Sequence, residues 1–503
     1  MLEKYFITTA IPYVNGYPHL GHALEFVQTD VLARYNRLRG REVFFLTGTD
    51  ENALKNVQSA EKAGEDVKTF IDRHADVFRK LTEVLNLSND DFIRTTEERH
   101  ILGAQKLWKA CEERGDIYKK KYQGLYCVGC ESFKTEKELI DGLCPEHKVE
   151  PEKVEEENYF FRLSGYEKEI LRMIESDELK ILPSSRKNEL TSFIKEGLED
   201  FSISRSRERV KNWGIPVPGD DSQILFVWFD ALSNYINALG YGGDESKFQE
   251  WWENNPNKEH LIGKGITRFH AIYWPAVLIS AKLKLPSQIL VHGYLTIDGE
   301  KISKSLGNVI DPFKVVEKYG VDPVRYFLLR EISSGEDGDF SEKKLEQRYQ
   351  ADLANGLGNL VQRVLTLIEN NLGGEINYLK RFEKSEVKEF IKNTEEKYRR
   401  NIEEFRLHEA LGNVFELIGF ANAYTNEHRP WDLAKENPDH FLEVMINLTL
   451  LVTAVSFWIY PFLPETAEKI LESFGLTLQD KIEELDHKKL VIKKGEVLFP
   501  RLS

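Results

Sequence analysis

Hydrophobic and polar positions in the first 50 residues follow the order strand, helix, strand. Residues 5–9 form a short run typical of a buried strand, and residues 42–46 form a second one. Between them, apolar side chains recur at helical spacing, for example at Leu24, Val27 and Val31. Units of this length predict a right-handed crossover and therefore a parallel sheet. The expected fold class of this part is α/β with an open parallel sheet.

The last third of the chain has a different pattern. From about Asp352 onward, almost every segment carries an apolar stripe at helical spacing. The first stripe consists of Leu353, Leu357, Leu360, Val361, Val364, Leu365 and Ile368. Successive amphipathic helices without strands predict an all-α helix bundle.

These patterns and the motifs below divide the chain into five expected segments. Residues 1–115 form the first half of the α/β domain, 116–225 an insertion, and 226–319 the second half of that domain. Residues 320–350 form a junction, and 351–503 form the helix bundle.

Composition limits the location of the protein. The chain has 503 residues, of which 41% are hydrophobic, enough for several domains with large cores. We expect no apolar stretch long enough to span a bilayer, and the N-terminus begins with a strand rather than a signal peptide. Both observations favour a cytoplasmic protein without a membrane contact.

The net charge of −15 argues against indiscriminate binding to nucleic acids. A nucleic-acid partner would need local basic surfaces, for which the candidates are Lys119–Lys121, Arg205–Lys211 and Arg399–Arg400. Each run is equally compatible with a solvated face.

The loop between the first predicted strand and helix ends in His19-Leu20-Gly21-His22. Such a loop lies at the carboxyl ends of parallel strands, where open α/β sheets bind ligands. Backbone N–H groups at the helix start attract phosphate, the imidazoles add donors, and Gly21 allows close approach of a nucleoside. Two histidines at this spacing can also be purely structural.

A second candidate for phosphate binding is Lys301-Ile302-Ser303-Lys304-Ser305, which follows a strand-like run and a turn. Two lysines on a loop that closes over a triphosphate would neutralise charge on the leaving pyrophosphate. The alternative is a solvated basic loop. The sequence has no Gly-x-x-x-x-Gly-Lys-Ser/Thr motif, so it is not an ordinary P-loop NTPase.

Three of the four cysteines cluster with a histidine. Cys127 and Cys130, followed by Cys144 and His147, form two pairs with two residues between the members of each pair. Four such ligands close a tetrahedron around a structural zinc ion and leave no position for an activated water. A redox Cys-x-x-Cys or coincidence is the alternative, and no disulfide scaffold is expected. Cys111 lies outside the pattern and is expected to be a core thiol.

The histidine and lysine motifs closely resemble the HIGH and KMSKS signatures of class I aminoacyl-tRNA synthetases. Their surroundings resemble methionyl-tRNA synthetases in particular, along essentially the whole chain. The segments that carry this resemblance are Thr9-Ala10-Ile11-Pro12-Tyr13-Val14-Asn15-Gly16, Val227-Trp228-Phe229-Asp230-Ala231-Leu232, Phe269-His270-Ala271-Ile272-Tyr273-Trp274-Pro275-Ala276 and His292-Gly293-Tyr294-Leu295. The resemblance implies a Rossmann-like catalytic domain with a zinc-knuckle insertion, followed by a helix-bundle anticodon-binding domain.

The resemblance also implies a methionine–tRNA ligase. L-Methionine and ATP, with Mg²⁺, would give methionyl-adenylate and pyrophosphate, and methionine would then pass to the 3′ end of tRNA(Met), including initiator tRNA. The residues implied to bind ATP are His19, Gly21, His22, Lys301, Ser303 and Lys304. Of these, the implied catalytic residues are His19, His22, Lys301 and Lys304. One structural Zn²⁺ per chain is implied at the cysteine and histidine quartet.

A hydrophobic pocket with one carboxylate would select methionine, because its thioether is apolar and polarizable and its ammonium group is charged. The residues implied in this site are Ile11, Tyr13, Asp50, Trp228, Ala231, Tyr235, Ile266 and His270. Some family members have Leu and Pro at the positions of Ile11 and Leu232, which changes the pocket shape slightly. Plainer interpretations are a core role for Trp228, a helix-face position for Tyr235 and a helix cap for Asp50.

The residues implied to read the anticodon are Asn359, Arg363 and Trp431, by base stacking and hydrogen bonds to base edges. Trp431 follows Pro430, so the alternative is a packing residue at a helix start. The chain ends where the family's core normally ends, which predicts a monomer, with a separate tRNA-binding subunit as an option.

Two other functions are compatible with the motifs. One is another class I synthetase, although leucine, isoleucine and valine enzymes carry larger editing insertions and a cysteine enzyme would place its metal at the substrate. The other is a non-catalytic tRNA-binding paralogue or a zinc-knuckle RNA-binding module. The intact histidines and lysines of both signatures argue against the second alternative.

Overall fold

The computed structural model of the chain describes residues 2–129, 132–134, 136–145, 148–297, 299–301, 309–481, 484–493 and 495–502. Its contacts divide the chain into two compact units. The first, called the sheet unit, comprises Met1–Glu25, Gly40–Glu83 and Ser88–His292. The second, called the helical unit, comprises Phe26–Arg39, Val84–Leu87 and Gly293–Ser503.

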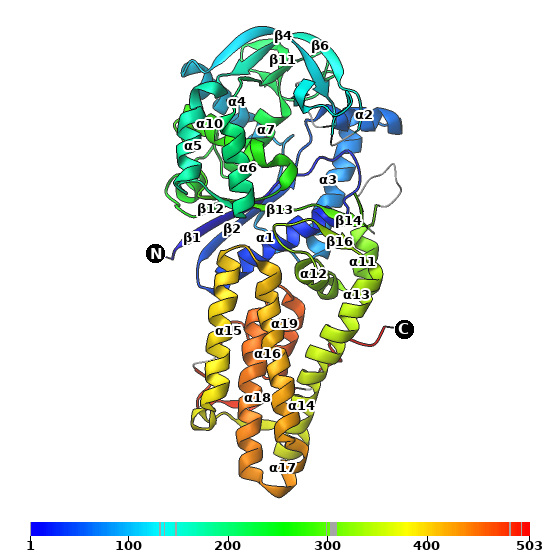
Figure 1. Cartoon of the computed structure of the whole chain (residues 1–503), viewed down its shortest axis with the longest axis vertical. Helices are drawn as coiled ribbons and strands as arrows, with labels where there is room; N and C mark the ends of the chain where they lie inside the picture. The colour runs from blue at the N-terminus through cyan, green and yellow to red at the C-terminus, as the bar shows by residue number, and fades with distance from the viewer. Residues whose placement is uncertain are drawn as a thin grey trace. The chain divides into compact units, whose positions relative to one another are not determined.

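A six-stranded parallel sheet lies at the centre of the sheet unit (Figure 1). Its strands follow the order β3-β2-β1-β12-β13-β7, and every neighbouring pair is parallel. The strands are β1 (Lys4–Thr9), β2 (Glu42–Thr49), β3 (Asp91–Arg94), β7 (Lys180–Leu182), β12 (Lys258–Gly263) and β13 (Gln288–His292). The central strand β1 is buried from Tyr5 to Thr9, as expected of a strand covered on both faces. The α/β prediction is confirmed.

Helices follow the strands and complete the core of this unit. They are α1 (Leu20–Leu38), α2 (Leu54–Ala63), α3 (Val67–Val84), α4 (Glu98–Glu113), α7 (Val227–Leu232), α8 (Asn234–Asn237), α9 (Ser246–Phe248) and α10 (Trp274–Ser280). Trp108 on α4, Trp252 and Trp274 on α10 are fully buried. Helix α1 begins in the sheet unit and ends in the helical unit.

An antiparallel region is inserted between β3 and β12. Strands β4 and β6 pair along their length in a four-stranded sheet of order β5-β4-β6-β8, and a three-stranded sheet has the order β10-β11-β9. The elements are β4 (Ile117–Cys127), β5 (Ser132–Lys134), β6 (Glu152–Phe161), α5 (Glu167–Glu175), α6 (Ser184–Lys195), β8 (Phe201–Ser202), β9 (Ser204–Ser206), β10 (Pro216–Val217) and β11 (Asp220–Leu225). Strand β7 comes from the same stretch of sequence but pairs with β13 in the central sheet.

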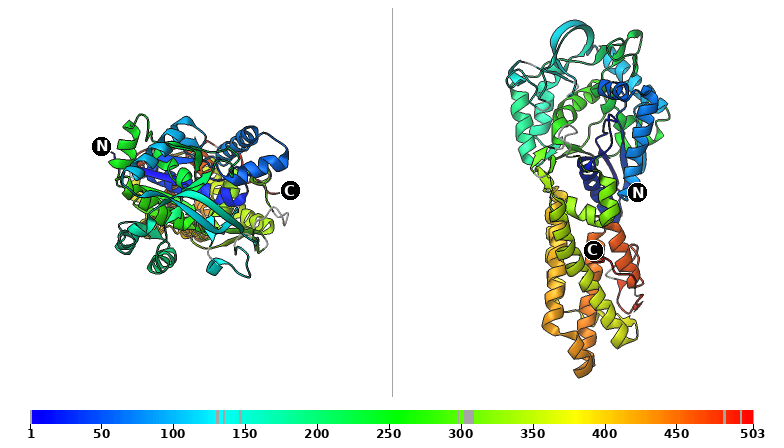
Figure 2. Two further views of the ribbon diagram at one scale, coloured as in Figure 1. Left: turned by 90° about the horizontal axis from the view of Figure 1, so that it is seen from above. Right: turned by 90° about the vertical axis from the view of Figure 1, so that its right-hand side faces the viewer.

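Long helices make up most of the helical unit and run side by side in a bundle (Figures 1 and 2). The helices are α11 (Pro312–Tyr319), α12 (Val321–Arg330), α13 (Glu342–Arg348), α14 (Asn359–Leu372), α15 (Ser385–Glu403), α16 (Leu407–His428), α17 (Pro430–Glu436), α18 (Pro438–Ile459) and α19 (Pro464–Ser473). The strands are β14 (Leu295–Ile297), β15 (Glu300–Lys301), β16 (Gly338–Phe340), β17 (Glu375–Asn377) and β18 (Lys489–Val491). The predicted helix bundle is confirmed.

Helix α18 corrects the expectation that no apolar stretch is long enough to span a bilayer. Its 22 residues have a window of mean hydropathy 1.8, so by length and composition it could cross a membrane. However, 78% of that window is buried inside the protein. The apolar stretch is therefore explained as the core helix of the bundle, which is hydrophobic on all sides because other helices surround it.

Three charged residues, called the ion cluster, are buried together in the helical unit. The Asp30 carboxylate forms ion pairs with Arg34, whose Nε lies 2.8 Å away, and with Arg325, whose Nη2 lies 2.7 Å away. Arg325 is fully buried and also donates to the backbone carbonyls of Phe462 and Leu85, at 2.8 and 3.0 Å. The cluster therefore joins the second half of α1 to the turn between α18 and α19.

Asp322, in the first turn of α12, is a further buried acid of the helical unit. Its Oδ2 atom accepts a hydrogen bond from the backbone N–H of Thr466 at 2.7 Å, in the first turn of α19. Burial raises the pKa of Asp322 to about 6, although the hydrogen bond to Thr466 and the charge of Arg325 both oppose this shift.

Candidate functional site

The predicted phosphate-binding histidines lie at the start of α1, directly after the loop that follows β1. The Nδ1 atom of His19 accepts a hydrogen bond from the backbone N–H of Gly21, and that of His22 accepts from the N–H of His19, both at 3.1 Å. The two rings stack with centroids 3.9 Å apart. A neutral imidazole that accepts at Nδ1 carries its proton on Nε2. Both rings are therefore set up as Nε2–H donors at a helix N-terminus.

Glu25 and His292 join the same edge of the sheet, and the sequence analysis did not assign them a role. Glu25, on α1, accepts from the backbone N–H of Ala10 at 2.8 Å, and its other oxygen lies 2.8 Å from His292 Nε2. Ala10 follows β1, and His292 ends β13. The carboxylate thus ties the carboxyl ends of two strands to the helix that carries the histidines. Only the polar character of Glu25 between Leu24 and Phe26 could have indicated this role.

Asp50 follows β2 and is 2% exposed. Its backbone N–H donates to the Pro12 carbonyl at 2.8 Å, and its Oδ1 accepts from the N–H of Asn52 at 3.3 Å. The N-cap of α2 is Ala53, so the helix-cap interpretation of Asp50 is wrong. The carboxylate is instead held in a short turn beside the loop after β1.

A buried hydrogen-bond network begins at Asn52, two residues after Asp50. Asn52 donates from Nδ2 to one oxygen of Asp230 at 2.7 Å, and His100 Nε2 lies 2.5 Å from the other. Asn237 contacts Nδ1 of His100 at 3.3 Å, so the proton of His100 is on Nε2 and points to Asp230. Both oxygens of Asp230 are therefore satisfied, as a buried carboxylate requires. Its partners are far away in sequence, and no motif predicted them.

Aromatic rings form one side of the predicted methionine pocket. Trp228 stacks on Phe269 with centroids 3.7 Å apart and 4° between the planes, and Tyr13 meets Trp228 edge-on at 6.3 Å. Lys55 places its ammonium group 3.2 Å from the centroid of the Tyr13 ring. Phe269 and Lys55 were not predicted as pocket residues.

The apolar pocket residues belong to one hydrophobic cluster. Trp228, Ala231 and Tyr235 are buried members of that cluster, and Ile11, Tyr13 and Ile266 are partly buried against it. Helices α7 and α8 carry the first three, while the loop after β1 carries Ile11 and Tyr13. The structure therefore brings these predicted residues together. Their roles in binding are not tested by this placement.

Tyr235 and His270 form a neutral pair in the interior. The Tyr235 hydroxyl lies 2.7 Å from Nε2 of His270, whose Nδ1 lies 3.0 Å from the carbonyl oxygen of Ile266. Because a carbonyl only accepts, His270 carries its proton on Nδ1, and Tyr235 donates to Nε2. Burial lowers the pKa of His270 to about 4 and raises that of Tyr235. Both groups are uncharged near pH 7.

The second predicted phosphate motif is described only at its start. Lys301 ends β15, which pairs antiparallel with β14 through Thr296. Ser303 and Lys304 lie outside the described residues. The convergence of the lysines with His19 and His22 stays a prediction.

Two of the four predicted zinc ligands are described. Cys127 ends β4, and the carbonyl of Cys144 accepts a hydrogen bond from the backbone N–H of Lys148 at 2.8 Å. Both cysteines are buried, at 1% and 0% exposure. Cys130 and His147 lie outside the described residues, within which no group of three metal-ligating side chains is found. Two buried thiols at a strand end and a tight turn fit a zinc knuckle.

The remaining cysteine and the basic runs have clearer outcomes. Cys111 is fully buried on α4, and burial raises the pKa of its thiol to about 12, so the core-thiol prediction is confirmed. Arg205 is only 3% exposed and stacks on Phe226, which excludes it from a basic surface. Lys119 is paired with Asp220 at 2.9 Å.

The predicted anticodon residues lie at one end of α14 and at the start of α17. The Arg363 guanidinium lies 5.5 Å from the centroid of the Trp431 ring, and its Nη2 donates to Asn426 at 3.1 Å. Asn359 is exposed in the first turn of α14, and Trp431 is 41% exposed. A tryptophan that served only to pack a helix start would be more deeply buried.

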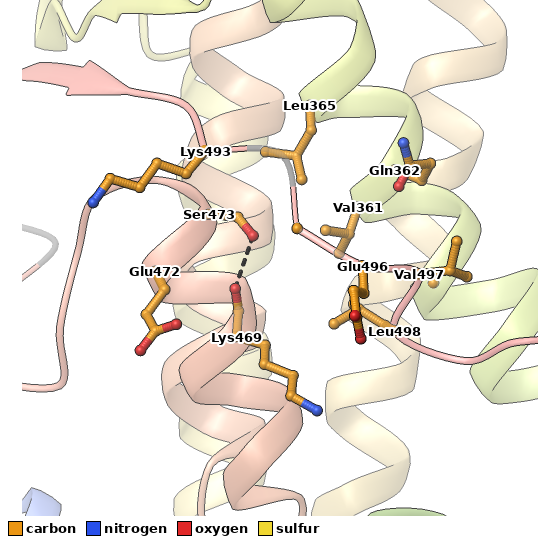
Figure 3. Close-up of a pocket in the computed structure, with 12 residues that line it drawn as sticks. Val361, Gln362, Leu365, Lys469, Glu472, Ser473, Lys493, Glu496, Val497 and Leu498 are labelled. Carbon is orange, nitrogen blue, oxygen red and sulfur yellow. Dashed lines mark hydrogen bonds between the residues drawn. The ribbon is translucent and has the colours of Figure 1, made fainter.

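A separate cavity of about 300 Å³ lies in the helical unit (Figure 3). Val361 and Leu365 of α14 line one wall, and Lys469 and Glu472 of α19 lie across from them. The predicted anticodon residues do not line this cavity.

Two family models match the chain. The model described as "tRNA synthetases class I (M)" matches residues 5–153 and 147–365, and the model described as "Anticodon binding domain of methionyl tRNA ligase" matches residues 380–500.

Relatives match over nearly the whole chain. A methionine–tRNA ligase of Brucella suis is 46% identical over 93% of this chain and 91% of the relative, and one of Thermotoga maritima is 42% identical over 99% and 80%. The solved structure of Mycobacterium tuberculosis methionyl-tRNA synthetase in complex with methionyl-adenylate has a TM-score of 0.93 and 39% identity. That match covers 99% of this chain and 100% of the solved one.

Proposed function

The chain belongs to the methionyl-tRNA synthetase family of class I aminoacyl-tRNA synthetases and is a methionine–tRNA ligase, and from this premise we propose how its residues divide the reaction. In the first step, a carboxylate oxygen of methionine bonds to the α-phosphorus of ATP. The bond from that phosphorus to the bridging oxygen breaks, and pyrophosphate leaves. In the second step, a terminal ribose hydroxyl of tRNA attacks the carbonyl of the mixed anhydride and releases AMP.

His19 and His22 hold the phosphates of ATP. Their Nε2–H groups and the N-terminus of α1 are donors that need no reorientation during the reaction. Gly21 leaves room for the nucleoside, and Lys301, Ser303 and Lys304 close over the phosphates and neutralise the leaving pyrophosphate. Mg²⁺ bound with ATP would supply additional charge neutralisation.

Methionine is held by one charge and an apolar pocket. Asp50 binds the ammonium group, and its fixed turn keeps the carboxylate in place. The side chain lies among Ile11, Tyr13, Trp228, Ala231, Tyr235, Ile266 and His270. Aromatic rings suit a polarizable sulfur, and the neutral state of His270 avoids placing a cation beside an apolar ligand.

The helical unit recognises tRNA(Met), both initiator and elongator. Asn359, Arg363 and Trp431 read the anticodon, since an exposed indole beside a guanidinium offers a stacking surface and base-edge donors. Cys127, Cys130, Cys144 and His147 would hold one structural Zn²⁺, which would fix the knuckle without taking part in the reaction. The enzyme acts in the cytoplasm.

The observation that carries this proposal is the pair of stacked histidines at the α1 N-terminus, fixed as Nε2–H donors at the same sheet edge as Asp50. The test is methionine-dependent exchange of labelled pyrophosphate into ATP, repeated with homocysteine and leucine. We expect exchange with methionine and weaker exchange with homocysteine, since one methylene is worth about 1–3 kcal/mol in an apolar pocket. Equal exchange with leucine, or none with methionine, would overturn the proposal.

A further inference from the structure

An exposed tyrosine, Tyr17, lies next to the histidine pair at the start of α1. It precedes His19 by two residues, in the loop that leads into the helix, and is 57% exposed. A single exposed aromatic side chain is common on protein surfaces and needs no explanation by itself. Tyr17 differs from such residues in the contacts that fix its ring and in its position relative to the histidines.

Two neighbouring side chains hold the Tyr17 ring in place. Arg73 Nη1 donates to the Tyr17 hydroxyl at 2.9 Å, and Glu65 fixes the same guanidinium by accepting from Nη2 at 2.7 and 2.8 Å. The ring packs against His74 with centroids 4.9 Å apart. His74 is 3% exposed, and its Nδ1 lies 2.8 Å from the carbonyl oxygen of Phe70. The ring is therefore oriented before a ligand binds, which lowers the entropy cost of using it for binding.

Helix α3 relates the position of Tyr17 to that of the histidine pair. His74 of α3 contacts Tyr17, and Phe78 of α3 meets His22 edge-on with centroids 5.1 Å apart. Four residues of an α-helix advance by about 6 Å. The contacts of Tyr17 and His22 with α3 are thus one helical turn apart, so the exposed ring lies close to the proposed phosphate site.

The inference rests on the proposed function, which places the phosphate of the adenylate beside His19 and His22. In the second step, a terminal ribose hydroxyl of tRNA attacks the carbonyl of that mixed anhydride, so the terminal nucleotide has to approach the same histidines. Its base is joined to the attacking ribose and must lie beside it. Proteins bind unpaired bases by stacking them on aromatic side chains. Tyr17 is the described residue that offers such a ring on this loop with more than half of its surface exposed.

We propose that Tyr17 is a stacking platform for the 3′-terminal base of tRNA and thereby positions the ribose hydroxyl for transfer. Methionine is not the ligand of this ring, because the hydrophobic cluster of the methionine pocket does not include the described residue Tyr17. The adenine of ATP is the competing ligand. Adenine belongs to the first step and the terminal base of tRNA to the second, so kinetics of the separate steps distinguish the two.

The test measures both steps with the full-length enzyme. Transfer is followed as the single-turnover rate at which preformed methionyl-adenylate charges tRNA, over a range of tRNA concentrations. Pyrophosphate exchange reports the first step. We expect Tyr17→Ala and Tyr17→Leu each to lower the second-order rate constant of transfer about tenfold, at the lower end of the value of one base–aromatic stack. The KM values for ATP and methionine in exchange should stay within about twofold of wild type.

Matched variants separate stacking from packing. Tyr17→Phe keeps the aromatic face and its contact with His74, so transfer should stay within about threefold of wild type. Leu102→Ala, at a position of α4 that is 46% exposed, is the control and should change neither step.

A modified tRNA tests the other partner of the stack. A tRNA that lacks only its terminal base and keeps the ribose should be charged by wild type about as slowly as intact tRNA is charged by Tyr17→Ala. The variant together with the modified tRNA should be no slower than either change alone, because both remove the same interaction.

Three results would overturn the inference. The first is an unchanged transfer rate in Tyr17→Ala, or losses that add when the variant meets the modified tRNA. The second is a raised KM for ATP with normal transfer, which would assign the ring to the adenine of ATP. The third is an equal loss in both steps, which would show a merely structural role. Absence of methionine-dependent exchange in wild type would instead refute the proposed function itself.

Discussion

The neutral pair Tyr235 and His270 of the sheet unit and the ion cluster of the helical unit bury polar groups in opposite ways. In the neutral pair, burial lowers the pKa of His270 to about 4 and raises that of Tyr235, so both side chains are uncharged near pH 7. In the ion cluster, Asp30 and Arg325 are buried just as deeply, but their side chains face each other as an ion pair at 2.7 Å.

The difference follows from what each cluster must do. A pocket for an apolar side chain gains from polar groups that have orientation but no charge, because an unpaired charge would have to be desolvated with the ligand. The ion cluster instead binds backbone carbonyls from two segments at once. A guanidinium has five donors in a rigid fork, which suits it to hold several chain segments.

Removal of Arg325 should have the largest effect. We expect Arg325→Met to destabilise the helical unit by about 3–5 kcal/mol, because it leaves a buried carboxylate short of a partner. Hydrogen exchange of peptides from α12 and α19, measured by mass spectrometry, reports the loss. The exposed Arg400→Met is the matched control and should change stability by less than about 0.5 kcal/mol. Unchanged protection in Arg325→Met would show that the cluster is not a structural clamp.

Asp50→Asn removes the single charge that we place in the methionine site, which otherwise includes the neutral pair. The kcat/KM for methionine should fall about 10- to 100-fold, since a hydrogen bond to a charged group contributes about 1.5–3 kcal/mol. The KM for ATP should stay within about twofold. Exposed Asp221→Asn serves as the control. A loss that falls on ATP rather than methionine would move Asp50 out of the amino-acid site.

Acidification should change the stability of the two units in opposite directions. The pKa of His270 is about 4 in the folded state and 6.5 ordinarily, so its contribution to stability is complete above pH 6.5 and falls as pH drops toward 4. The pKa of Asp322 is about 6 when folded and 3.8 ordinarily, so its contribution is complete below 3.8 and is lost as pH rises through 6.

Between pH 7 and 5, the sheet unit should therefore lose on the order of 2 kcal/mol through His270, and the helical unit should gain on the order of 1 kcal/mol through Asp322. Urea unfolding of His270→Asn and Asp322→Asn at both pH values measures each contribution as a difference from wild type. The exposed His487→Gln is the control. If both contributions to stability changed in the same direction between pH 7 and 5, the expected difference between the two units would be wrong.

Trp431→Ala should have the smallest effect and tests the surface of the helical unit. We expect the KM for tRNA to rise about tenfold, at the lower end of the value of one base–aromatic stack, while adenylate formation stays unchanged. Val491→Ala, also at an exposed position, is the control. Equal damage to both reactions would indicate a folding defect instead of a lost contact with tRNA.

Local sequence patterns predicted many of the helices and strands. Which elements pack together was decided by contacts between distant parts of the chain. Period and motif were enough to place β1, α1 and the helix bundle, and to identify Cys111 as a core thiol. Hydrophobic period could not show that β7 joins the central sheet, since a three-residue strand has too few positions to display one. It also gave no warning that α18 would be apolar on all sides.

The polar networks were missed for a related reason. His100 and Asp230 lie 130 residues apart, and Arg325 and Asp30 are separated by a still longer stretch. Within its own segment, each such residue only interrupts an apolar run. Its partner is defined by the packing of distant elements, which one sequence does not display. The resemblance named the pocket residues but not Lys55, whose ammonium group lies over the Tyr13 ring.

The most direct test of an uncharged methionine pocket is calorimetry of methionine binding at pH 6.5 in two buffers that differ in ionisation enthalpy. The neutral pair predicts the same observed binding enthalpy in both buffers, because His270 neither gains nor loses a proton when methionine binds. A difference equivalent to about one proton per site would show that a pocket histidine titrates on binding, and would contradict the neutral pocket.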